Sequence, residues 1–197
     1  MIKEGFLIFE KMEKQFEQHY LDLQKQTKLL LKQVYSLSST TYHYQPREDK
    51  WSISQILTHL LISEKLSLAY MKKKSLGMKE VDDAGIFERL KLFVLKISQR
   101  LPIRFKAPKG VLEKTPPPLS FGDLVRQWEA TRSELQDFLA QIEKENVQKK
   151  IYKHPVVGRL SAVQALQFFI EHLNHHRPQV LAIVEEVKRK NLEKSAD

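Results

Sequence analysis

The chain has 197 residues, of which 42% are apolar and 29% charged, and it contains no cysteine. This length is enough for one domain with a substantial core, and the lack of cysteine excludes a disulfide scaffold, a thiolate metal site and a cysteine nucleophile. The apolar cluster at residues 6–9 is too short for the core of a signal peptide, and no apolar run is long enough to span a bilayer. We therefore expect a cytoplasmic protein.

The formal net charge of +9 comes from 33 basic and 24 acidic residues that are spread along the chain. Two short basic clusters, at residues 72–74 and 188–190, fall where helices are expected to end, and cations there complement the helix dipole. A basic surface also attracts phosphate, so nucleic-acid binding is kept as an alternative function. The sequence offers no aromatic-rich ribonucleoprotein motif, zinc finger or basic zipper in its support.

Helical periodicity dominates the sequence, because apolar residues recur at three- and four-residue steps over four long segments. Long amphipathic helices are expected over residues 6–37, 52–75, 121–145 and 161–190. Two of these helices start with the spacing of a capping box, namely Ser52 with Gln55 and Ser161 with Gln164. Residues 41–50 and 146–159 are polar and contain proline, which predicts loops.

A long crossover at residues 76–120 separates the second long helix from the third. It is expected to hold a shorter helix over residues 84–99 and then the proline-rich stretch 100–118, through which no helix can pass. Four long amphipathic helices with one long connection indicate an all-α four-helix bundle. We expect a single domain over residues 1–190, followed by a frayed tail at residues 191–197.

Histidine is the residue type that points to chemistry. His172 and His176 are four positions apart on the fourth helix, so both imidazoles lie on one face and can close onto one metal ion. Leu173 stands where a metalloprotease has its glutamate, so that class of enzyme is excluded. A third ligand must come from another helix, and His59, at the edge of the apolar face of the second helix, is the natural candidate. Three neutral histidines would leave coordination positions open, as catalytic metal sites do.

Other roles for these residues stay open. A helical histidine is commonly a hydrogen-bonded core or boundary residue, and His59 taken alone fits that role better. His175 lies a quarter-turn from His176 and is expected at the surface. Gln179 is expected to orient a water molecule or to bond a neighbouring helix. Glu64 does not share the face of His59, and no general base is assigned.

The remaining histidines and the two tryptophans have more ordinary expected roles. His19, His43 and His154 are isolated in the sequence and are interpreted as ordinary polar residues. Trp51 and Trp128 are interpreted as packing anchors rather than as platforms for a substrate.

Two segments, WSISQILTHL at residues 51–60 and HLNHHRPQV at residues 172–180, resemble the DinB-like (DinB/YfiT) superfamily. Its members show a tryptophan-serine helix start leading to a histidine, and then a distant H-x-x-x-H-x-x-Q motif. The resemblance extends to helix order and loop placement over nearly the whole chain. It implies an up-down-down-up bundle and a divalent metal held by three histidines, which here are His59, His172 and His176.

Two features depart from the family pattern. Many members have a small residue or glycine where Pro178 stands; a proline there frees the carbonyl of Asn174 and should kink the helix beyond the ligands. The basic, proline-rich insert at residues 100–118 is the second departure, and it is expected to help cover the site.

The resemblance implies a metal-dependent enzyme, since relatives include hydrolases and thiol-dependent transferases. Imidazole ligands suit zinc, nickel, copper or iron, and zinc or nickel is favoured here. We expect a small-molecule substrate, with a low-molecular-weight thiol as one candidate and a homodimer left open, and we expect neither a membrane nor nucleic acid as partner. The alternative is a non-catalytic bundle in stress response, with or without a metal.

Overall fold

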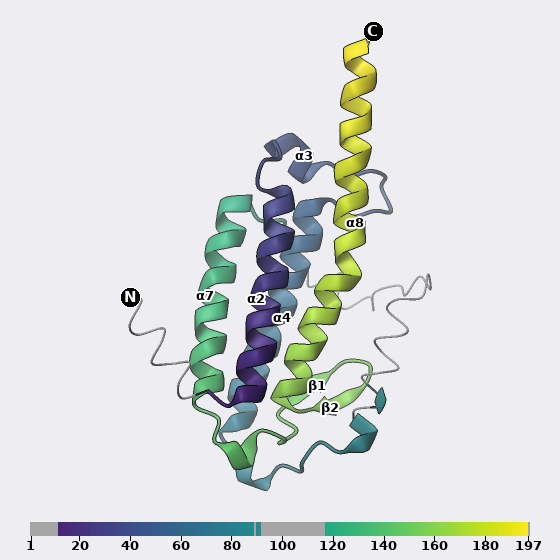
Figure 1. Cartoon of the computed structure of the whole chain (residues 1–197). Helices are drawn as coiled ribbons and strands as arrows, with labels where there is room; N and C mark the ends of the chain where they lie inside the picture. Colours follow the sequence, from purple (N-terminus) through teal and green to yellow (C-terminus); the bar gives the residue numbers. More distant parts are fainter. Residues whose placement is uncertain (1–11, 89, 92–116, 197) are drawn as a thin grey trace.

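The computed structural model describes residues 12–88, 90–91 and 117–196. Four long helices lie side by side in this part of the chain (Figure 1). They are α2 (Lys14–Val34), α4 (Ile53–Ser75), α7 (Phe121–Ala140) and α8 (Ala162–Ala196). Helices α2 and α8 run in one direction and α4 and α7 in the other, as the sequence colours of Figure 1 show. The expected all-α, up-down-down-up four-helix bundle is therefore confirmed.

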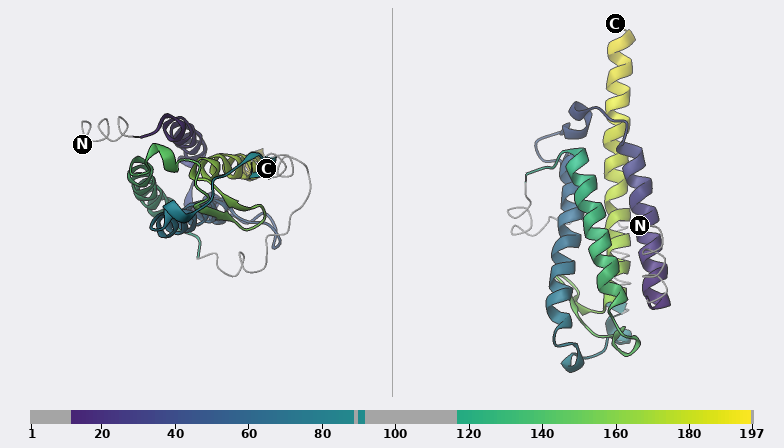
Figure 2. Two further views of the ribbon diagram at one scale, coloured as in Figure 1. Left: turned by 90° about the horizontal axis from the view of Figure 1, so that it is seen from below. Right: turned by 90° about the vertical axis from the view of Figure 1, so that its left-hand side faces the viewer.

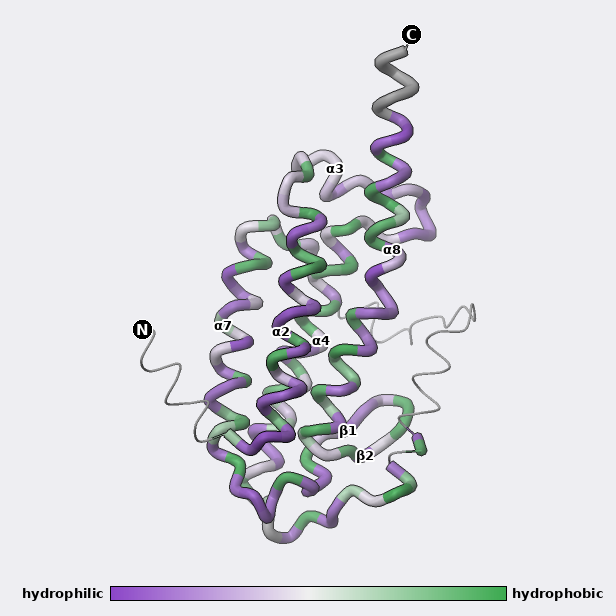
Figure 3. Tube along the Cα trace, viewed as in Figure 1, coloured by the Kyte–Doolittle hydropathy of each residue, from purple (hydrophilic) through white to green (hydrophobic). Residues whose placement is uncertain are grey.

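The four long helices pack in a fixed order. Helix α8 packs against both α2 and α4, and α4 packs in turn against α7, an arrangement seen end-on in Figure 2. The buried apolar side chains form two contiguous clusters, one around Phe16 and Phe169 and the other around Ile53 and Trp128. Figure 3 shows apolar and polar residues alternating along each of the four long helices.

Serine caps determine where three of the long helices begin. The Oγ of Ser52 accepts the N–H of Gln55 at 3.2 Å, and the Oε1 of Gln55 accepts the N–H of Ser52 at 2.8 Å. Ser161 and Gln164 make the same reciprocal pair, at 3.3 and 2.9 Å. Both expected capping boxes are thus confirmed. A third serine, Ser120, caps α7.

The ends of two helices differ from the sequence-based expectation. Helix α2 ends at Val34 instead of residue 37, and the short helix α3 (Ser39–His43) follows it after a turn. Helix α7 ends at Ala140 instead of residue 145, and the 3-10 turn η2 (Lys144–Asn146) takes up the rest. The 3-10 turn η2 contains no apolar residue and α3 buries only Tyr42, so apolar periodicity says little about where either long helix ends.

Helix α8 is longer than expected. It continues through Ala196, so the backbone expected to form a frayed tail at residues 191–197 is helical as far as that residue. Pro178 lies inside the helix and supplies no N–H, which leaves the carbonyl of Asn174 without its helical donor. The axis of α8 changes direction part-way along the bundle in Figure 1, in line with the expected kink.

A two-stranded antiparallel hairpin stands where a loop was expected over residues 146–159. Strand β1 (Tyr152–His154) pairs with β2 (Gly158–Leu160) beside the start of α8 (Figure 1). Gly158 has a φ of +83°, which glycine adopts readily because it has no Cβ. Each strand has only three residues, too few for an alternating pattern to stand out in the sequence.

The crossover is described only at its two ends. After the 3-10 turn η1 (Met78–Glu80), the backbone runs beside residues 148–150, where Lys150 donates its N–H to the carbonyl of Asp82 at 2.9 Å. The helix expected over residues 84–99 begins at Ile86, and its residues 89 and 92–99 lie outside the described residues. So do residues 6–11 of the first expected helix and 100–116 of the proline-rich stretch. None of the described helices has the length and apolar character needed to cross a membrane.

Candidate metal centre

Three histidines from two helices meet between α4 and α8. His59 lies on α4, and His172 and His176 lie one turn apart on the neighbouring α8. Their ring centroids form a nearly equilateral triangle with sides of 5.0, 5.2 and 4.9 Å. Each ring offers one ligand nitrogen, and these three atoms lie within 4.8 Å of one another. The structure thus brings together the three residues that the sequence singled out.

The spacing of these nitrogens fits the coordination sphere of a metal ion. The Nε2 atoms of His59 and His172 are 3.1 Å apart. Two imidazole nitrogens bound tetrahedrally to zinc, each at 2.0–2.1 Å from the ion, are about 3.3 Å apart. Neutral imidazoles are also the ligands that zinc, nickel, copper and iron accept. The donor set therefore fits a divalent transition metal, with positions left for further ligands.

Local structure holds each ring in this arrangement. The capping box at Ser52 sets the start of α4, and His59 follows two turns later at the edge of the buried face. Leu173, between the two histidines of α8, is fully buried in the core, which turns His172 and His176 toward α4. Helix packing of this kind places side chains more firmly than a loop would.

Aromatic rings flank the histidine cluster on two sides. Trp51, directly before the cap of α4, lies 4.9 Å from the ring of His59 and is stacked on His176 at 6.2 Å. Phe168, one turn before His172 on α8, stacks on that ring at 5.2 Å with an interplanar angle of 17°. These rings limit how the imidazoles can turn and exclude water from their faces.

The environment of the cluster keeps all three histidines neutral. Burial lowers the pKa of His59 to about 4 and that of His176 to about 3, and it lowers the pKa of His172 well below its ordinary value. The nearby histidines add to this effect, because a second charge so close would be repelled. At neutral pH the rings therefore present lone pairs, which is the form that binds a metal.

Gln179 contacts His176 on its own helix, a partner that the sequence did not predict. Its Oε1 lies 3.1 Å from Nδ1 of His176, so it bonds to a histidine of the cluster rather than to a neighbouring helix. His175 was expected at the surface; it is half-buried, with its ring 5.0 Å from that of His176. The one-residue offset between them on α8 keeps His175 outside the group of three.

The remaining histidines have separate places in the fold. His19 pairs with Gln167 through its Nε2 at 3.2 Å, and His43 packs edge-on against Tyr42. His154, interpreted from the sequence as an ordinary polar loop residue, is instead buried in the hairpin, where its ring lies 4.4 Å from Phe168. His154 is buried because the hairpin turns its side chain inward against α8.

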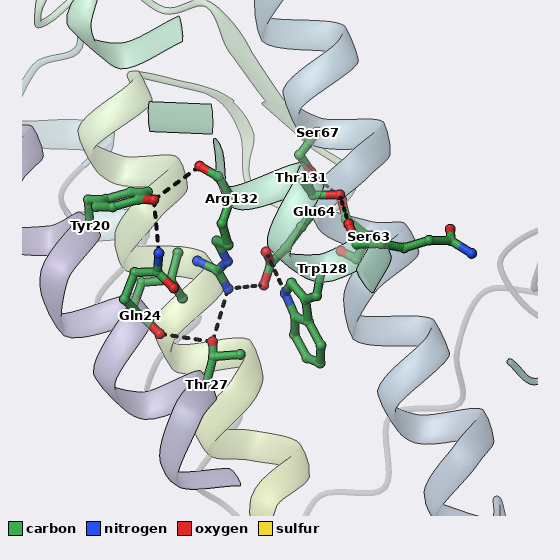
Figure 4. A network of polar contacts seen from close by, with 11 residues as sticks. Tyr20, Gln24, Thr27, Ser63, Glu64, Ser67, Trp128, Thr131 and Arg132 are labelled. Carbon is green, nitrogen blue, oxygen red and sulfur yellow. Dashed lines mark hydrogen bonds and ion pairs between the residues drawn. The ribbon is translucent and has the colours of Figure 1, made fainter. Parts of the chain in front are cut away.

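A buried ion pair joins Glu64 of α4 to Arg132 of α7 (Figure 4). Glu64 accepts a hydrogen bond from Arg132 at 2.9 Å and another from Nε1 of Trp128 at 3.1 Å. The side chains of Glu64 and Arg132 are 5% and 4% exposed. This confirms that Glu64 does not share the face of His59, and it shows Trp128 as a packing residue with a polar partner.

The role of Trp51 was missed by reasoning from the sequence, which treated it only as a packing anchor. Its ring contacts two of the three clustered histidines. The available signal was its position beside Ser52, because the residue before a helix cap packs against the first turns of the helix. That rule predicts a contact on α4 and gives no information about α8.

Comparisons with known proteins agree with this architecture. The chain matches the model of the DinB superfamily over residues 22–180. It is 26% identical over 153 residues to the uncharacterized protein YuaE of Bacillus subtilis (strain 168), a match that covers 78% of this chain and 89% of YuaE.

A solved structure has the same fold. YfiT from Bacillus subtilis, described as a probable metal-dependent hydrolase with an unusual four-helix bundle topology, matches with a TM-score of 0.59. The two sequences are 15% identical, and the match covers 87% of each chain. Together with the family match over most of its length, this likeness means that the chain belongs to the DinB superfamily.

Proposed function

We propose that this protein is a metal-dependent enzyme that acts on a small molecule, with His59, His172 and His176 as the ligands of a divalent transition-metal ion. One observation carries the proposal: three ligand nitrogens from two helices lie within 4.8 Å of one another. The three rings are partly buried and are flanked by the aromatic rings of Trp51 and Phe168. Zinc or nickel is the ion we favour, because both accept a set of neutral imidazoles.

When bound, such an ion supplies Lewis-acid activation of water or of a thiol. The protein contributes the positions of the three rings that would hold the ion, and a set of three histidines would leave coordination positions for further ligands. Trp51 and Phe168 keep two of the rings in place and shield their faces from solvent. A small electrophilic substrate fits this arrangement, because the nucleophile is delivered at one fixed point.

The solved relative YfiT is described as a probable metal-dependent hydrolase, and this description supports water as the nucleophile in the reaction proposed here. Hydrolysis is therefore the reaction we propose first, and transfer to a low-molecular-weight thiol is the variant of the same chemistry. A panel of small esters, amides and epoxides, incubated with the metal-loaded protein in the presence and absence of a thiol, separates the two outcomes.

The direct test of the metal centre is a metal titration of the whole protein. We expect one equivalent of zinc or nickel to bind and to raise the unfolding temperature, because a ligand that binds only the folded state at 100 times its Kd adds about 2.7 kcal/mol. His172→Ala should abolish both the stoichiometric binding and the thermal shift.

The matched control is His19→Ala, which removes a half-buried histidine bonded to α8 but outside the cluster. This variant should bind one equivalent as the unaltered protein does. The proposal fails if the unaltered protein takes up no stoichiometric metal, or if His172→Ala still binds one equivalent with an unchanged thermal shift.

A further inference from the structure

The contact between Gln179 and His176 bears on which nitrogen of His176 faces the cluster. The two residues are three positions apart on α8, and Oε1 of Gln179 lies 3.1 Å from Nδ1 of His176. An amide oxygen can only accept a hydrogen bond, so the proton of the neutral imidazole is on Nδ1. The other nitrogen, Nε2, then carries the lone pair.

This tautomer prepares His176 to bind a metal through Nε2 without a prior shift of its proton. A neutral imidazole that carries its proton on Nε2 offers no lone pair at that atom. His176 is 8% exposed, so solvent does little to orient it. Trp51 is stacked on one face of the ring at 6.2 Å, and Gln179 fixes one edge, so the ring is held from two directions before any ion arrives.

We propose that Gln179 is a positioning residue of the metal centre, which holds His176 as the Nδ1–H tautomer with Nε2 free for the ion. The inference rests on the proposed function for the identity of the ligand, but the tautomer itself is a property of the metal-free protein. Partners that bond the second nitrogen of a metal-binding histidine generally fix its orientation and raise its basicity.

The chain offers a matched control on the same helix. Gln167 also contacts a histidine, with its Nε2 at 3.2 Å from Nε2 of His19, and that histidine is not part of the cluster. Gln167→Leu therefore removes a Gln–His contact from α8 without touching His176. The side chain of Gln179 is exposed, so Gln179→Leu and Gln179→Glu are expected to fold.

The first measurement uses the metal-free protein. Long-range ¹⁵N–¹H NMR spectra of the histidine rings at neutral pH distinguish Nδ1–H from Nε2–H tautomers. We expect His176 to be Nδ1–H in the unaltered protein, in Gln179→Glu and in Gln167→Leu, and to move toward Nε2–H in Gln179→Leu. The inference is overturned if His176 is Nε2–H in the unaltered protein, or if Gln179→Leu leaves its tautomer unchanged.

The second measurement is zinc affinity, by competition with a chromophoric chelator. Loss of such an outer partner weakens metal binding by about 10–100-fold, and this is the loss we expect for Gln179→Leu. Gln179→Glu, whose carboxylate accepts from Nδ1 more strongly, should bind zinc at least as tightly as the unaltered protein, and Gln167→Leu should bind it equally well.

The outcomes separate this inference from the proposed function. If the unaltered protein binds zinc and Gln179→Leu binds it equally well, or if Gln179→Glu or Gln167→Leu loses as much affinity as Gln179→Leu, only the positioning role of Gln179 is overturned. If the unaltered protein binds no zinc, the proposed function fails, and the NMR measurement still decides whether Gln179 sets the tautomer of His176.

Discussion

His154 uses its imidazole as a structural acceptor in the turn of the hairpin. Its Nδ1 accepts the backbone N–H groups of Val156 and Val157 at 3.1 and 3.2 Å. An imidazolium ion has no acceptor atom, so protonation breaks both hydrogen bonds. Burial lowers the pKa of His154 to about 4, which keeps the acceptor available at neutral pH.

We predict that His154 makes the fold sensitive to acid. Its pKa is about 4 when folded and 6.5 when unfolded, so the unfolded chain takes up a proton first as the pH falls. The contribution of His154 to stability is complete above about pH 6.5 and declines between 6.5 and 4, by about 3 kcal/mol in total. Urea unfolding at several pH values in this window measures the decline.

His154→Asn is the variant that isolates this effect. The Oδ1 of asparagine can accept the same two N–H groups and does not titrate. Protonation of the buried histidines of the cluster also destabilises the fold over this pH range. The quantity to follow is therefore the difference in the free energy of unfolding between the unaltered protein and His154→Asn. Equal losses of stability between pH 6.5 and 4 in both proteins would show that His154 does not contribute.

At the level of single residues, the sequence predicts contacts within one helix better than contacts between helices. The four-residue spacing of His172 and His176 predicts that both lie on one face of the helix, and the structure confirms it. The pairing of Glu64 with Arg132 was not foreseen, because the two residues are 68 positions apart and lie on different helices. Which charged residue becomes buried depends on the packing of α4 against α7.

Two glycines show how the same residue type acts differently in a helix and in a hairpin. Gly122 lies in the first turn of α7, and a Cβ built on it meets no atom within 4 Å. Gly158 at the start of β2 has equally open surroundings but a φ of +83°. The two sites therefore differ in backbone conformation and not in the space available for a side chain.

We predict opposite effects for alanine at these two glycines. Gly122→Ala should stabilise the protein by about 0.5 kcal/mol, since alanine loses less backbone entropy on folding. Gly158→Ala should destabilise it by about 1–2 kcal/mol, because a Cβ is disfavoured in the left-handed region. Urea unfolding midpoints at neutral pH give both values, and a loss of stability in Gly122→Ala or a gain in Gly158→Ala would contradict the argument.

At the level of elements, the sequence predicts the long helices and misses the short structures. Each long helix has several turns of apolar periodicity, so its existence is clear even where its end is displaced. The hairpin of β1 and β2 has three residues in each strand, and it is stabilised by packing on α8 rather than by its own pattern. The hairpin therefore cannot be predicted from its own residues, because it depends on packing against α8.

The ion pair of Glu64 and Arg132 ties three helices of the bundle together. Arg132 on α7 bonds Glu64 on α4 and donates a second hydrogen bond, at 3.0 Å, to Thr27 on α2 (Figure 4). Burial raises the pKa of Glu64 and lowers that of Arg132, and the attraction between the two charges opposes both shifts. Each charge is thus tolerated in the core because the other is present.

We predict that Arg132→Met destabilises the protein by about 3–5 kcal/mol, because it leaves Glu64 buried without a counter-charge. The double variant with Glu64→Gln should be more stable than Arg132→Met alone, since both charges are gone and glutamine still accepts from Trp128. A double-mutant cycle measured by urea unfolding checks this coupling.

The exposed pair of Lys72 and Glu134, which joins the same two helices, serves as the control. Glu134→Gln should change the free energy of unfolding by less than about 1 kcal/mol, because a solvent-exposed pair contributes little. If Glu134→Gln costs as much as Arg132→Met, burial is not the reason for the strength of the inner pair.

The histidines of the candidate metal centre are close in space and far apart along the chain, because His59 and His172 are 113 positions apart. During synthesis on the ribosome, His59 emerges long before its two companions, so a nascent chain that lacks α8 has no chelating set. The entropy of closing so long a loop must be overcome by docking α8 before an ion can be captured. For the metal centre proposed above, loading would therefore be a late event in biogenesis, and a bound ion would mark chains whose helices have all docked.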